Sequence, residues 1–145
     1  MRRVEAGITI AATPAEVFAF VADLANLPRW QTGIVSAERT SPDPVGVGST
    51  ARVVRSMAGQ SLTVDLTITE FEPGHRLALA SQASGVSVTA TLEMDPVDDG
   101  TVARSGIEIK AGSVFMAPLE GMIAGAAASE LASGLERLRD AVEAG

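Results

Sequence analysis

The sequence predicts an α+β protein in which seven antiparallel strands form one sheet and a long C-terminal helix packs against it. Three observations support this fold class. Segments with alternating apolar and polar residues recur from residue 34 to residue 109, separated by short turns rich in Gly, Pro and Asp. One similar segment opens the chain, and helically spaced apolar residues close it. Two short helices are expected between the first and second strands.

The first strand is expected over Val4–Ala11, where every second residue is apolar. A helix should begin directly afterwards, because Thr13 is a suitable N-cap and a proline follows at the first helical position. Glu16 stands three residues after Thr13, which is the spacing of a capping box. This helix should end near Leu24, and a second, short helix is expected over residues 26–30.

The next part of the chain has the period of β-strands. Leu62, Val64, Leu66 and Ile68 alternate with polar residues, as in a strand with one buried face. Short connections between successive strands indicate antiparallel pairing. The six later strands are expected over residues 34–39, 49–57, 62–69, 76–82, 86–94 and 101–109.

The C-terminal helix is expected over Pro118–Glu143, with its apolar residues spaced three and four apart. Its second half carries leucines that can pack tightly against the sheet. Its first half, over Gly121–Ala128, consists mostly of Gly and Ala. Either the helix approaches the sheet closely there, or a cavity remains beneath it.

Composition limits the possible functions. The 145 residues correspond to one domain, residues 1–145, by the usual range of domain sizes. The chain has no cysteine, no tyrosine and one histidine, which excludes disulfides, thiol catalysis and multi-histidine metal sites. Eleven basic and 18 acidic residues give a net charge of −7, so a nucleic acid partner is not expected.

No apolar run is long enough for a transmembrane helix, and the N-terminal residues lack the apolar core of a signal peptide. A cytoplasmic location is therefore expected. The sequence carries no recognisable cofactor motif, since Gly46-Val47-Gly48 lacks the further residues of a nucleotide-binding loop. We expect neither a cofactor nor a metal.

Several local motifs together resemble the START-like (SRPBCC) superfamily, in particular its polyketide cyclase/dehydrase-like bacterial branch. The matching segments are Ile8–Phe18, Asn26–Trp30, Gly46–Ser49, Ile68–Leu77 and Leu135–Leu138. The resemblance implies the helix-grip fold, in which the sheet wraps around the long C-terminal helix and leaves a deep cavity. It also implies binding of lipids, polyketides or aromatic compounds, with cyclisation or dehydration in some members. The family has no universal catalytic set, so no catalytic residue is carried over.

Few polar residues are candidates for chemistry. Glu120 falls near the apolar line of the C-terminal helix, so it would either point into the cavity with a raised pKa or turn to solvent at the helix start. Arg52 and Arg55 have opposite facing, so one of them should point to the concave side. His75 is expected in an exposed turn, and Trp30 either at the pocket mouth or packed against the sheet.

We therefore expect a small hydrophobic or amphipathic ligand in an internal cavity, and a closed cavity of roughly 300 Å³ or more would support this expectation. The alternatives are a cyclase or dehydratase, with Glu120 or an arginine polarising a carbonyl group, and a protein-interaction module with an exposed apolar patch. The partner is a small hydrophobic ligand, and the protein would be a monomer or a homodimer. The expected ligand-binding residues are Phe20, Trp30, Val64, Leu66, Leu79, Val88, Ala90, Met116, Met122, Ile123 and Ala127.

Overall fold

The computed structural model describes residues 2–42, 44–57, 59–83, 85–114 and 117–144. The predicted order of elements is confirmed, and a single 3-10 turn, η1, joins the two short helices. In chain order the elements are β1 (Arg2–Ile10), α1 (Pro14–Ala22), η1 (Leu24–Asn26), α2 (Leu27–Trp30), β2 (Ile34–Arg39), β3 (Thr50–Met57), β4 (Gln60–Glu72), β5 (Arg76–Ala83), β6 (Val86–Val97), β7 (Gly100–Ala111) and α3 (Ala117–Glu143).

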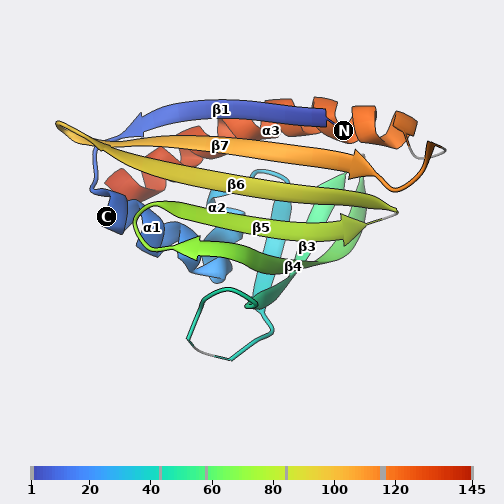
Figure 1. The fold of residues 1–145 in the computed structure, drawn as a ribbon, viewed down its shortest axis with the longest axis horizontal. Coiled ribbons are helices and arrows are strands. Elements are labelled where there is room, and N and C mark those ends of the chain that lie inside the picture. The colour runs from blue at the N-terminus through green and yellow to red at the C-terminus, as the bar shows by residue number, and fades with distance from the viewer. Residues whose placement is uncertain (1, 43, 58, 84, 115–116, 145) are drawn as a thin grey trace.

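The seven strands form one antiparallel sheet in the order β1-β7-β6-β5-β4-β3-β2. The register shifts once between β2 and β3, near residue 35, and once between β4 and β5, near residue 69. Such irregularities bend a strand and increase its twist. In Figure 1, β2 and β3 accordingly run steeply across the direction of β5, β6 and β7, so that the sheet curls around the helices behind it.

The helices all lie on the concave side of this sheet (Figure 1). The local start of α1 follows the expected chemistry, because the Thr13 hydroxyl accepts a hydrogen bond from the backbone N–H of Glu16 at 3.2 Å. The long helix α3 contacts β1, β7 and α2. At Gly134, α3 approaches the end of α2 closely, because an added Cβ atom would lie 2.9 Å from the carbonyl oxygen of Trp30.

The buried side chains form two clusters. The larger one joins α1, η1 and α2 to the central strands and includes Leu135 and Leu138 near the end of α3. The smaller one consists of Val86, Ile109 and Ala127, with partly buried neighbours from the start of α3. The second half of α3 therefore belongs to the main core, whereas its first half packs near β7, the start of β6 and Arg2 of β1.

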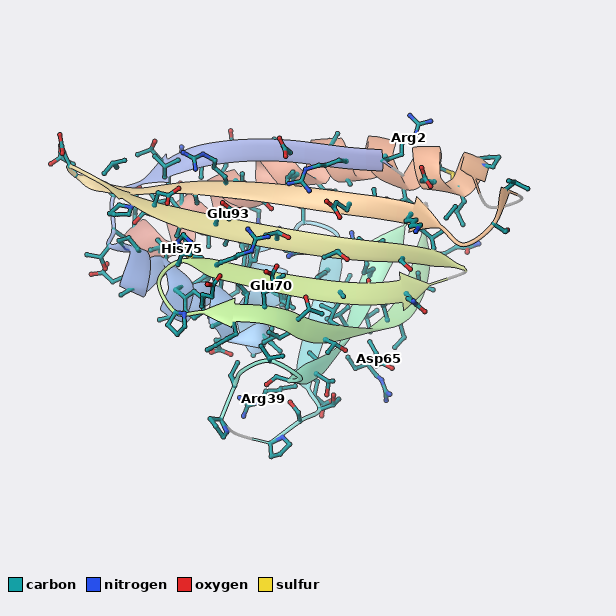
Figure 2. All side chains as sticks on the ribbon, viewed as in Figure 1. Arg2, Arg39, Asp65, Glu70, His75 and Glu93 are labelled. Atoms are coloured by element: carbon teal, nitrogen blue, oxygen red, sulfur yellow. The ribbon has the colours of Figure 1, made fainter. Side chains whose placement is uncertain are left out.

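The outer face of the sheet carries charged side chains that pair across strands. Arg76 contacts both Glu70 and Glu93, and Arg52 lies 3.1 Å from Asp65. Figure 2 shows Glu70, Glu93 and Asp65 on this outer side, away from the helices. The alternation predicted for β4 is thus confirmed: Asp65 faces solvent, whereas Val64 and Leu66 face inward.

Candidate functional site

A cavity of about 180 Å³ lies between the concave face of the sheet and α3. It separates the two hydrophobic clusters and has members of both in its wall. The small side chains of Ala126 and Ala127 face it, so the alanine-rich half of α3 leaves space instead of packing closely. The volume is below the roughly 300–1,000 Å³ of pockets for drug-sized ligands, and so below the size named above as support for ligand binding.

Most of the residues predicted to line a cavity do so. The inward positions of β4, β5 and β6 and one face of α3 contribute them, as the period of two in strands and 3.6 in helices requires. The predicted residues found in the wall are Trp30, Val64, Leu66, Leu79, Val88, Ala90, Ile123 and Ala127.

Two predicted lining residues lie elsewhere. Phe20 packs against the edge of the main core, and the Arg29 guanidinium sits 4.9 Å from the centre of its ring. Met122 is 62% exposed, because Ile123 and Ala127 occupy the inward face and Met122 lies about 100° around the helix from Ile123. The prediction for Met116 falls outside the described residues.

An ion pair between Arg55 and Glu130 lies in the cavity wall, and the sequence analysis named only Arg55 as a candidate. Arg55 on β3 points to the concave side and donates a hydrogen bond from Nη2 to Glu130 Oε2 on α3 at 2.7 Å. The two side chains remain 27% and 34% exposed, which places the pair where the cavity meets solvent. Glu130 was missed, although it follows Ala127 at the helical spacing of three that defines this face.

Two residues of the wall carry a buried donor that has no hydrogen-bond partner among the described residues. These donors are the indole N–H of Trp30 (Nε1) and the guanidinium N–H of Arg55 (Nε). An unsatisfied buried donor costs on the order of 1–3 kcal/mol, and buried polar groups in proteins are normally paired. Ser81, Thr91 and Ser105 also belong to the lining of the cavity.

Glu120 is buried but does not line the cavity, so it takes neither of the two orientations expected from the sequence. Its Oε2 accepts a hydrogen bond from the backbone N–H of Ala111 at 2.8 Å, and its Oε1 lies 4.0 Å from Arg2 Nε. The hydrogen bond from Ala111 and the positive charge of Arg2 lower the pKa of Glu120. This carboxylate fastens the first turn of α3 to the end of β7.

The other polar candidates face solvent. Arg52 pairs with Asp65 on the outer face of the sheet, so Arg55 is the arginine that points to the concave side. His75 is exposed in the turn between β4 and β5, where its backbone N–H donates to the carbonyl of Glu72 at 2.9 Å (Figure 2).

The fold and the cavity agree with comparisons to known proteins. A family model described as "Polyketide cyclase / dehydrase and lipid transport" matches residues 1–143. The chain belongs to this family. The expected polyketide cyclase/dehydrase-like branch is thereby confirmed, and the description of the family names cyclases, dehydrases and lipid transport.

Individual relatives support the same fold. A START superfamily protein from Mycobacterium smegmatis superposes with a TM-score of 0.76 at 16% identity, over 97% of this chain and 98% of its own. The Zhui aromatase/cyclase from Streptomyces sp. R1128 gives 0.77 at 15% identity, over 98% of this chain and 93% of its own. An uncharacterised protein of Mycobacterium tuberculosis is 37% identical over 71 residues, which are 49% of this chain and 41% of that protein. The match thus spans about two-fifths of the curated relative.

Other kinds of site find no support in the described part of the chain. No group of three or more metal-ligating side chains comes together within residues 2–42, 44–57, 59–83, 85–114 and 117–144. No helix within these ranges combines the length and hydropathy that a membrane span requires.

Proposed function

We propose that this protein binds a small, mainly apolar molecule in the cavity beneath α3. The observation that carries the proposal is the combination of an apolar wall with two buried donors that lack partners, on Trp30 and Arg55. Pockets for small molecules have this character: apolar surface supplies affinity, and a few polar groups fix the orientation. A ligand with a hydrogen-bond-accepting oxygen would satisfy donors that the protein leaves unpaired.

The cavity volume sets the size of the proposed ligand. An engineered apolar cavity of about 150 Å³ accepts benzene, so 180 Å³ suits one ring with a short substituent. Burial of such a ligand contributes about 25 cal/mol per Å² of apolar surface before the cost of association. A long acyl chain would require α3 to move away from the sheet. An aromatic or cyclic ketone fits the observed space best.

Calorimetric titration with acetophenone tests this proposal, and a filled cavity provides the specificity control. Ala127→Leu places a larger side chain in the cavity wall, where Ala127 is 8% exposed. Ala128→Leu makes the same substitution one residue further along α3, at an exposed position. We expect the wild type and Ala128→Leu to bind acetophenone with similar affinity, and Ala127→Leu to lose binding at least about tenfold. Equal binding by all three proteins would refute the proposed site.

A catalytic role is the second candidate, and the convergence of Arg55 and Glu130 favours it. An enzyme acting on a carbonyl compound needs at least two polar groups that face one space. Arg55 would donate a hydrogen bond to the carbonyl oxygen, and Glu130 would accept a proton from the adjacent carbon. Deuterium exchange into the methyl group of acetophenone, followed by NMR, measures this proton transfer. Exchange that the wild type accelerates and Glu130→Gln does not would support catalysis; no acceleration by the wild type would contradict it.

A further inference from the structure

We infer that Glu130 determines ligand specificity by forming an ion pair with Arg55 that balances its positive charge. The cavity then selects neutral ligands and rejects carboxylates. The inference rests on the proposed function, since it concerns the ligand class of the same cavity. A pocket arginine would ordinarily favour an acidic ligand, because guanidinium and carboxylate groups form strong, paired hydrogen bonds. The contacts of Arg55 oppose that expectation.

Arg55 and Glu130 are the only charged residues in the cavity wall within the described ranges, and they form a pair. Glu130 on α3 is therefore the counter-ion of Arg55. A ligand carboxylate near Arg55 would either displace Glu130 or lie beside a second carboxylate. Two like charges next to one guanidinium repel each other, and removal of one carboxylate from its partner leaves a partly buried charge unpaired.

The backbone beside the pair restricts its rearrangement. A Cβ atom on Gly33 would lie 2.6 Å from Arg55 Nη2 and 3.0 Å from each carboxylate oxygen of Glu130. The pair thus packs directly against the loop between α2 and β2, and glycine leaves the space that it fills. The Glu130 carboxylate thus occupies the position beside Arg55 Nη2.

A neutral oxygen meets no such conflict. The Nε–H of Arg55 and the indole N–H of Trp30 are the donors without partners, and neither belongs to the hydrogen bond with Glu130. A ketone oxygen can accept from either of them while the ion pair stays intact. Nη2 of Arg55 therefore binds Glu130, while the Nε–H of Arg55 and the indole N–H of Trp30 remain for a ligand.

Titration with acetophenone and benzoate at pH 7 tests the inference, because the two probes have nearly the same size and differ in charge. We expect the wild type to bind acetophenone at least about tenfold more tightly than benzoate. Glu130→Gln keeps an oxygen next to Arg55 but removes the charge, and should tighten benzoate binding relative to acetophenone binding by about tenfold. Glu136→Gln, at an exposed position of α3, removes the same charge away from the cavity and should change neither.

The double variant Arg55→Gln/Glu130→Gln identifies the source of any gain, since benzoate binding should fall back to the wild-type level without the guanidinium. Benzoate binding that equals acetophenone binding in the wild type, or a gain that persists in the double variant, would overturn the inference and leave the proposed function standing. The comparison of acetophenone and benzoate binding by the wild type tests the inference even if a variant fails to fold. Failure of both probes to bind the wild type would overturn the proposed function itself.

Discussion

Replacement of Gly134 by alanine should destabilise the protein, although alanine is the better helix former by about 1 kcal/mol. The reason is the contact between α3 and α2, where the added Cβ atom would lie 2.9 Å from the carbonyl oxygen of Trp30. That oxygen belongs to the backbone and cannot rotate away, so α3 must shift. Overpacking of this kind costs typically about 1–3 kcal/mol, which cancels or exceeds the gain in helix propensity.

Gly125→Ala is the matched control for this prediction. Gly125 lies on the same helix, is exposed, and has no atom from outside its own stretch of helix within 4 Å of the added Cβ position. Alanine there should stabilise the protein by about 0.4–1 kcal/mol. The two variants should therefore differ by about 1–3 kcal/mol in the free energy of unfolding, measured by urea denaturation followed by circular dichroism. If Gly134→Ala were as stable as Gly125→Ala, the close approach of α3 to α2 would be wrong.

Two further predictions concern stability. The carboxylate of Glu120 has a lowered pKa in the folded state, so it stabilises the fold above its ordinary pKa of about 4.3 and loses this effect as the pH falls through the folded value. Glu120→Gln should therefore be less stable than the wild type at pH 7, with the difference shrinking below about pH 4.3 in thermal unfolding; a constant difference would contradict the role of Glu120. Met94→Ala should cost about 2–5 kcal/mol because Met94 is fully buried, whereas Met122→Ala should change stability by less than about 0.5 kcal/mol, and similar losses in urea denaturation would refute the assignment.

Much of the fold could be predicted because short-range chemistry determines its elements. The hydroxyl of Thr13 caps α1 through a neighbour three residues away, a contact that the sequence contains in full. The alternation in β4 likewise determines which of its residues face inward, and Val64 and Leu66 do so. Helical spacing likewise predicted that Ile123 and Ala127 of α3 face inward, and both line the cavity. The prediction failed for Met122, whose apolar character suggested burial that the helical phase does not allow.

The polar part of the site depends on contacts between distant residues, which a single sequence does not reveal. Arg55 and Glu130 are 75 residues apart, and their pairing requires the curvature that brings β3 near α3. The period of two in strands left Arg52 and Arg55 as candidates for the inward arginine, but it did not identify Glu130 as the partner. For Glu120, burial was foreseeable from the helical phase, whereas its hydrogen bond depends on where β7 ends and α3 begins. The cavity volume depends on how closely α3 approaches the sheet, which no local pattern encodes.

The central claim, that the cavity beneath α3 binds a small apolar ligand, is tested most directly by the NMR signal of the Trp30 indole N–H. Trp30 is the only tryptophan in the chain, lines the cavity, and has an indole N–H without a partner, so this group gives one isolated resonance. Addition of acetophenone should shift this resonance downfield, as hydrogen bonding does, and the shift should disappear in Ala127→Leu. A stationary indole signal in the presence of saturating acetophenone, with shifts confined to residues of the outer sheet face, would contradict the account.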